Sequence, residues 1–204
     1  PEDAALVLNT PFSLIRTIGK NVFVIPDYFE EGQLDKVYSP VRQLASDSIP
    51  FRKKNVVVMI VESFGSEYVG ALNEYEGYTP FLDSLISESL IWEHSFGNGR
   101  KSIDGMPSVL SSIPMFVEPF FLTPASVNDV GGIARELNKE GYYSAFFHGA
   151  ENGSMGFQAF ARTTGFQDYF GRTEYGQDDR FNRDKDFDGM WAIWDEPFLQ
   201  YMAL

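Results

Sequence analysis

Polar side chains follow apolar stretches at two points of the chain where they could take part in chemistry. Glu62 directly follows the run NVVVMIV at residues 55–61, and His148 directly follows YYSAFF at residues 142–147. If both runs are strands of one parallel sheet, their carboxyl ends share an edge, which is where open α/β sheets bind ligands. A carboxylate there is either a metal ligand or a helix cap, because a helix N-terminus also favours negative charge.

The segment NGRKSIDG, residues 98–105, places a hydroxyl beside two cations. Ser102 directly follows Arg100 and Lys101, and a short helix is predicted to begin at this point. Backbone amides and basic side chains together stabilise the charge that develops on a phosphate or sulfate ester. The segment therefore predicts an ester-binding turn, in which Arg100 and Lys101 bind the substrate. The alternative is an ordinary helix cap at Ser102, flanked by solvated cations.

Ser102 needs activation, because a serine hydroxyl is a poor nucleophile without a neighbouring base or metal. The histidines of the chain are His94 and His148, and the sequence contains no G-x-S-x-G motif. Metal activation with Glu62 as a hard oxygen ligand is therefore the simpler hypothesis. For His148 the alternative is a polar residue that merely ends a strand, and for His94 we predict a structural role.

The elements that must position these residues alternate between strand and helix patterns. Residues 55–61 and 142–148 predict strands. Helices are predicted at residues 79–92, with Thr79 as cap and Pro80 first, at 106–113 before Pro114, at 133–140 before Gly141, at 156–164 and from Asp195 onward. This alternation predicts an α/β fold with a largely parallel central sheet flanked by helices.

Composition excludes several classes of protein. The 204 residues are 44% hydrophobic, which is enough for one domain, and contain no cysteine, which excludes disulfides and thiol catalysis. A net charge of −13 without a basic stripe argues against a nucleic-acid partner. No apolar run approaches the roughly 20 residues of a membrane span. Because the chain begins at Pro1 and ends within a predicted helix, we expect a piece of a longer protein.

Longer blocks of the sequence resemble the extracytoplasmic domain of the lipoteichoic acid synthase-like family, within the sulfatase and alkaline phosphatase superfamily. The blocks are NVVVMIVESFGSEYVG (55–70), YTPFLDSLISESLIWEHSFGNGRKSIDGMPSVLSSIP (78–114) and YYSAFFHGAENGSMGFQAFARTTGF (142–166). The segment LNTPFSLIRTIGK (8–20) resembles the connector after the family's membrane helices. We therefore expect residues 1–50 to connect to a missing N-terminal membrane region. Residues 51–204 would be the N-terminal part of a sulfatase-like catalytic domain, truncated at its C-terminus.

The resemblance implies a metal-dependent transferase or hydrolase of phosphate esters. It would move a phosphoglycerol-type head group from an anionic phospholipid or glycan, outside the cytoplasm, in a parent protein anchored in the membrane. The metal would be manganese, with zinc or magnesium as alternatives. Glu62 matches the first metal-binding acid, Ser102 the nucleophile that also binds the metal, and His148 a substrate-site histidine. Lipoteichoic acid synthases carry threonine at the position of Ser102.

The sequence departs from the family pattern in three ways. The Trp and Arg that grip glycerol phosphate would fall near Gly156 and Gln158, so that pocket differs. Ser102 lacks the C/S-x-P-x-R context of true sulfatases, which favours a phosphate over a sulfate substrate. No Asp-His dipeptide is present to complete the metal site, so the fragment could be inactive by itself. A sulfatase and an inactive lipid-binding relative are the alternatives.

Overall fold

The computed structural model describes residues 11–12, 15, 28–30, 32–39, 50, 52–92, 94–115 and 118–204. It divides into two compact units, Pro1–Val58 and Met59–Leu204. The first unit contains α3 (Leu34–Val37), a single helical turn without buried side chains. Most of the predicted connector, residues 1–50, lies outside the described residues, so the division at residue 50 stays a prediction. None of the described helices is long and apolar enough to cross a bilayer.

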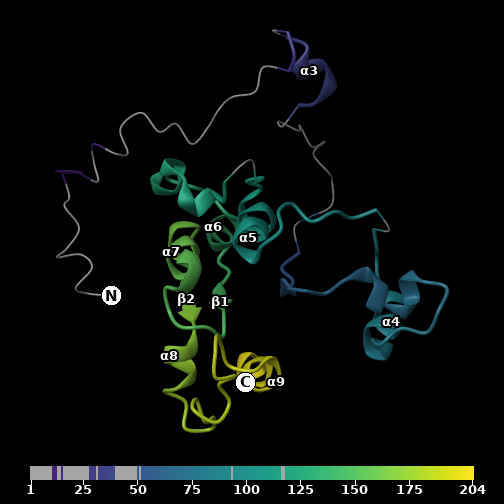
Figure 1. The fold of residues 1–204 in the computed structure, drawn as a ribbon, viewed down its shortest axis with the longest axis vertical. Helices are drawn as coiled ribbons and strands as arrows, with labels where there is room; N and C mark the ends of the chain where they lie inside the picture. Colours follow the sequence, from purple (N-terminus) through teal and green to yellow (C-terminus); the bar gives the residue numbers. More distant parts are fainter. Residues whose placement is uncertain are drawn as a thin grey trace. The chain divides into compact units, whose positions relative to one another are not determined.

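A parallel strand pair lies at the centre of the second unit. β1 (Ala145–Phe147) pairs with β2 (Asp168–Phe170), and Phe146 stands opposite Tyr169 in the register. α7 (Phe157–Thr163) connects the two strands, as a parallel pair requires, and α6 (Ile133–Lys139) precedes them (Figure 1). This β–α–β arrangement confirms the prediction of an α/β fold with parallel strands.

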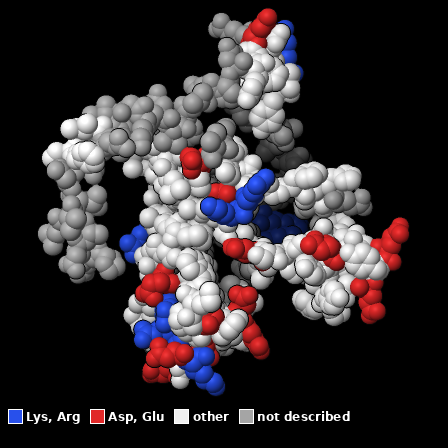
Figure 2. Space-filling view, in the orientation of Figure 1, with Lys and Arg blue, Asp and Glu red and all other residues white. Residues whose placement is uncertain are grey.

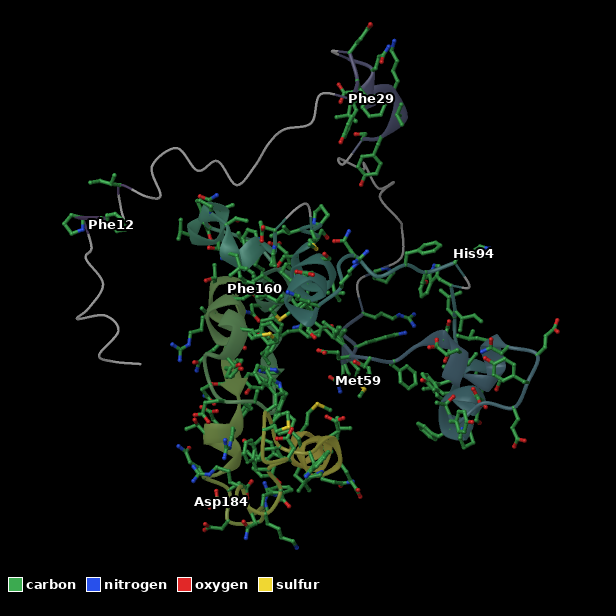
Figure 3. All side chains as sticks on the ribbon, viewed as in Figure 1. Phe12, Phe29, Met59, His94, Phe160 and Asp184 are labelled. Carbon is green, nitrogen blue, oxygen red and sulfur yellow. The ribbon has the colours of Figure 1, made fainter. Side chains whose placement is uncertain are left out.

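The main apolar core lies where α5 (Ser102–Ser111) meets α7 and β2. The buried residues of α5 recur at helical spacing, which places them on one face of the helix. Together with α7 and β2 they form a cluster of Ile103, Met106, Leu110, Phe157, Phe160, Ala161 and Tyr169. Figure 3 shows Phe160 within these packed side chains, where Phe121 of η3 (Phe120–Leu122) lies edge-on to its ring at 5.1 Å. η4 (Pro124–Val127) follows η3.

A second cluster joins the carboxyl end of β2 to the C-terminal helix. Tyr175 of α8 (Arg172–Tyr175) packs with Ile193 and with Phe198 of α9 (Asp195–Ala203). The Tyr175 hydroxyl donates a hydrogen bond to Asp186 at 2.8 Å, which ties the loop after α8 to this cluster. Acidic and basic side chains alternate over α8 and that loop (Figure 2), and include ion pairs Asp178–Arg180 and Arg183–Asp184.

Most predicted helices are confirmed at their starting residues. α4 (Pro80–Ile86) begins at Pro80 with Thr79 as N-cap, although it ends before the predicted residue 92. α6, α7 and α9 lie where helices were predicted. α5 begins at Ser102, where the segment NGRKSIDG predicted a helix start and ahead of the pattern at 106–113. Short 3₁₀ turns, η1 (Ser66–Tyr68), η2 (Gly70–Leu72) and η5 (Ser154–Gly156), complete the described elements.

The strand predicted at residues 55–61 is wrong for this structure. These residues have no regular secondary structure, and the side chain of Met59 remains 59% exposed (Figure 3). A strand is stable when its backbone groups bond to a neighbouring strand. The described sheet consists of β1 and β2 paired with each other, and it supplies no partner to the run. Its apolar composition alone therefore does not make a strand.

Candidate active site

Ser102 is the first residue of α5, and its hydroxyl donates a hydrogen bond to Oε2 of Glu62. The helix begins here because Lys101 has an extended backbone and Asp104 binds the preceding amides. Oδ2 of Asp104 accepts from the N–H groups of Arg100 and Lys101 at 3.1 and 3.2 Å. The structure thus brings together the two residues for which the sequence predicted a shared metal site.

Glu62 does not cap a helix. The next helical element, η1, has Gly65 as its N-cap and no side-chain cap hydrogen bond. Ser63 has a φ of 55°, a conformation that is uncommon for residues other than glycine, and it turns the chain directly after Glu62. The exposed Glu62 carboxylate binds the Ser102 hydroxyl instead. This geometry favours the site hypothesis over the cap hypothesis for this residue.

The site hypothesis and the helix-cap hypothesis can also be compared for Ser102. Lys101, not Ser102, occupies the N-cap position of α5, so the serine is already inside the first turn. Its hydroxyl hydrogen bonds to a residue 40 positions earlier in the chain rather than to the adjacent backbone amides. An ordinary cap would bond to amides of its own first turn. The Ser102 hydroxyl is therefore free of a capping role.

The predicted cations directly precede Ser102 in the chain. Arg100 and Lys101 are exposed, and neither forms an ion pair with another described residue. They line a cavity of 480 Å³ whose other lining residues are Gly97, Gly99, Asp104, Met115, Glu118 and Pro119. Gly99 has a φ of 106°, and a Cβ there would lie 2.2 Å from Cβ of Asp104. The glycine therefore lets Asp104 approach the loop and hold both cationic residues in place.

His148 follows β1, as predicted, and is half-buried. Its backbone N–H donates to the carbonyl of Phe170 at 2.9 Å, and its Nδ1 lies 3.3 Å from the hydroxyl of Tyr169. The ring of Phe157 packs against the imidazole at 4.7 Å. Burial lowers the pKa of His148 to about 4, while the nearby charge of Glu62 acts in the opposite direction. The ring is therefore neutral near pH 7.

Among the described residues, no hydrogen bond or ion pair joins the other sequence-predicted positions to Ser102, Glu62 or His148. His94 is exposed in the loop before α5 (Figure 3). Gly156 is the N-cap of α7 with a φ of 73°, and Gln158 lies within α7. The positions near which the family carries Trp and Arg thus serve here to begin a helix. Tyr169 was missed because β2 is too short to give a periodic pattern.

The metal hypothesis can be tested against the chemistry of the side chains. Carboxylate and hydroxyl oxygens such as those of Glu62 and Ser102 suit hard divalent cations. Within residues 52–92, 94–115 and 118–204, however, no three His, Asp or Glu side chains are arranged to hold a metal ion. The pair therefore fits one side of a metal site, and a bound ion would need further ligands.

Comparison with known proteins gives the family. A model of the sulfatase family matches residues 54–203. A protein in the alkaline phosphatase superfamily from Vibrio parahaemolyticus has a TM-score of 0.57 and 24% identity, over 69% of this chain and 33% of its own. The lipoteichoic acid synthase LtaP from Listeria monocytogenes has a TM-score of 0.51 and 22% identity, over 62% of this chain and 30% of its own.

The two solved structures share the fold of this chain, which spans about a third of the length of each. The family match covers both Glu62 and Ser102 as well as the β1–α7–β2 unit. These findings confirm the resemblance on which the sequence-based prediction depended. The chain belongs to the sulfatase family.

Proposed function

We propose that the protein containing this chain is a transferase or hydrolase of phosphate esters with Ser102 as its nucleophile. The observation that carries this proposal is the hydrogen bond from the Ser102 hydroxyl to Glu62. Arg100 and Lys101 directly precede this serine in the chain. A nucleophile needs a group that orients and activates it, and a transferred phosphoryl group needs positive charge around its oxygens. Glu62 would orient the nucleophile, and Arg100 and Lys101 at the start of α5 would supply the positive charge.

The proposed reaction uses these residues in two steps. Ser102 Oγ attacks phosphorus, and the bond from phosphorus to the leaving alcohol breaks. The alcohol takes up the proton that Oγ releases, and the phosphoryl group remains on Ser102. Water or an acceptor alcohol then attacks phosphorus and frees Oγ, which regains a proton. Glu62 orients the hydroxyl, while Arg100 and Lys101 stabilise the charge on the oxygens that do not react.

A divalent cation fits this scheme in part. Glu62 and Ser102 would hold it, and it would make the Ser102 hydroxyl easier to ionise. From the family resemblance we propose manganese, with zinc or magnesium as alternatives. The same resemblance supports a phosphoglycerol-type head group, taken from an anionic phospholipid or glycan, and a membrane-anchored parent whose domain lies outside the cytoplasm.

The test uses the full-length protein that contains this chain, with vesicles of phosphatidylglycerol as substrate. Ser102→Ala should lower head-group release by on the order of 10³-fold or more, because it removes the nucleophile. Ser102→Thr is the matched control, since it keeps a hydroxyl at the same position, and it should retain measurable turnover. Undiminished release by Ser102→Ala would remove this residue from the mechanism.

A sulfate ester is the alternative substrate, because family membership alone does not select between the two anions. Comparing nitrophenyl sulfate with nitrophenyl phosphate on the full-length protein separates them. We expect faster turnover of the phosphate, since Ser102 stands before Ile103 and Asp104 rather than in the C/S-x-P-x-R context. Turnover of the sulfate alone would establish the sulfatase alternative.

An inactive lipid-binding relative is the second candidate function. The observation that favours it is that Gly156 and Gln158, near which the family pattern has Trp and Arg, form the start of α7. Manganese titration of the full-length protein by calorimetry distinguishes the candidates. Saturable binding that Glu62→Gln weakens would support the enzyme, whereas no heat at millimolar manganese would support the lipid-binding relative.

A further inference from the structure

Tyr169 holds the imidazole of His148 through the one hydrogen bond that the ring makes within the described part of the chain. The phenol oxygen lies 3.3 Å from Nδ1, and the pair connects β2 to the residue that follows β1. Tyr169 is itself fixed, because it is 9% exposed and its ring stacks on Phe146 at 5.5 Å. Phe157 packs against the imidazole from another side. Both partners of this hydrogen bond are thus held by packing.

The direction of the hydrogen bond follows from what each atom can do. A neutral imidazole carries its proton on one nitrogen, and the other nitrogen accepts. If Nδ1 carried the proton, the phenol would accept, and its own hydrogen would lack an acceptor among the described residues. An unsatisfied buried donor costs free energy, whereas a phenol that donates to Nδ1 is satisfied. Burial raises the pKa of Tyr169 to about 12, which keeps its proton in place for this bond.

We propose that Tyr169 is a positioning residue that fixes His148 with its proton on Nε2, so that Nε2–H donates a hydrogen bond to an ester oxygen of the substrate. Nε2 makes no hydrogen bond with any residue the structure describes, so it is available to a ligand. In this state His148 is a donor, and neither a general base nor a metal ligand through Nε2. The role toward substrate rests on the proposed function, whereas the position of the proton does not.

Nitrogen-15 NMR of the full chain tests the position of the proton directly. Histidine labelled at both ring nitrogens gives resonances from every histidine, and the signals that His148→Gln removes identify those of His148. We expect an unprotonated, pyridine-type Nδ1 and a protonated, pyrrole-type Nε2 at pH 7. A pyrrole-type Nδ1 in the unmutated chain would overturn the proposal without any variant.

Tyr169→Phe then tests the cause, because it keeps the ring and removes the hydroxyl. The Nδ1 resonance should move as its hydrogen bond is lost and the other proton position gains population. Tyr143→Phe is the matched control: its hydroxyl donates to Asp168 at 2.8 Å, away from His148, so the His148 resonances should not move. A Tyr169→Phe spectrum identical to that of the unmutated chain would show that Tyr169 does not position the proton.

Kinetics of the full-length protein test the donor role toward the substrate. Loss of a positioning hydrogen bond of about 1 kcal/mol predicts a roughly fivefold rise in KM for a nitrophenyl phosphodiester, with kcat nearly unchanged. Tyr143→Phe should leave both constants unchanged. An unchanged KM in Tyr169→Phe would overturn the donor role. A different result would contradict the proposed function itself, namely full activity of the Ser102→Ala variant.

Discussion

Residues 55–61 and 142–148 have the same pattern, an apolar run followed by a polar side chain, yet they differ in structure. Within the second run, Ala145–Phe147 form β1, which is shorter than the predicted strand. Its partner β2 follows α7 in the chain and packs into the main core. The first has no strand partner in the described chain, and its side chains remain exposed. An apolar run therefore indicates where a strand could form, but the strand forms only where a neighbouring strand can pair with it.

This difference divides the candidate site as well. Ser102 lies on α5, and His148 directly follows β1. Both elements pack into the main core. Glu62 lies on the segment without a strand partner, and its described side-chain hydrogen bond is the one from Ser102. One part of the site is therefore positioned by packing and the other by a single polar contact. The predictions below test this contrast.

The largest expected effect is the loss of a core side chain on the packed side. Phe160 is 3% exposed, and Phe160→Ala should lower the free energy of unfolding by about 3–5 kcal/mol because it leaves a cavity. Met59→Ala is the control in the unpaired run, where the exposed side chain predicts a change within about 0.5 kcal/mol. Urea unfolding of the full chain measures both.

A large loss in Met59→Ala would contradict the contrast between the regions. It would mean that residues 55–61 are packed in solution, as the sequence pattern predicted. Equal losses in the two variants would have the same meaning. A loss in Phe160→Ala alone would establish that the β1–α7–β2 unit carries the stability of the chain.

The second prediction concerns the residue at the end of β1. Burial lowers the pKa of His148 to about 4, below its ordinary value of 6.5, so the unfolded chain binds more protons between these pH values. Stability should therefore be fully present above pH 6.5 and fall as the pH approaches 4. The expected loss is on the order of 3 kcal/mol.

His148→Gln removes the titrating group and should flatten the pH dependence between 6.5 and 4. Urea unfolding at several pH values measures it, with His94→Gln as the control, since His94 is exposed. If the unmutated chain and His148→Gln lose stability in parallel, the imidazole is not held neutral by burial. The end of β1 would then be as open as the segment around Glu62.

The sequence predicted those parts of the fold whose signals are local. Pro80 after Thr79 predicted the start of α4, and Gly141 the end of the helix before β1, because these residues act within one turn. It did not predict β2, whose three residues take their conformation from pairing with β1. The wrong strand prediction at residues 55–61 has the same cause, because the residues of a run do not specify whether a distant strand will pair with it.

The candidate site shows the same division between local and distant signals. Ser102 was placed at a helix start by the residues beside it, and the helix is there. The sequence predicted that Glu62 serves Ser102 from the end of a strand, yet the structure forms the contact between them without a strand at residues 55–61. Tyr169 could not be found, because its importance comes from a contact with His148 across two strands.

The smallest expected effects concern the loop that holds the carboxyl ends of β1 and β2 together. Asn152 donates to both carboxylate oxygens of Glu174 at 3.0 and 2.9 Å, and the N–H of Gly171 donates to the same carboxylate at 2.7 Å. A Cβ at Gly171 would lie 2.3 Å from Oδ1 of Asn152. Gly171→Ala should therefore displace Asn152 and cost about 1–3 kcal/mol in urea unfolding.

Gly105→Ala makes the same chemical change on α5, where a Cβ would meet nothing within 4 Å. Since alanine is the better helix former, this variant should gain about 0.5–1 kcal/mol rather than lose it. The opposite signs would show that the strand ends on the packed side are held by close contacts of the kind that residues 55–61 lack. If Gly171→Ala were also neutral or stabilising, the loop between the strand ends could move aside. The packed and unpaired regions would then differ less than their contacts indicate.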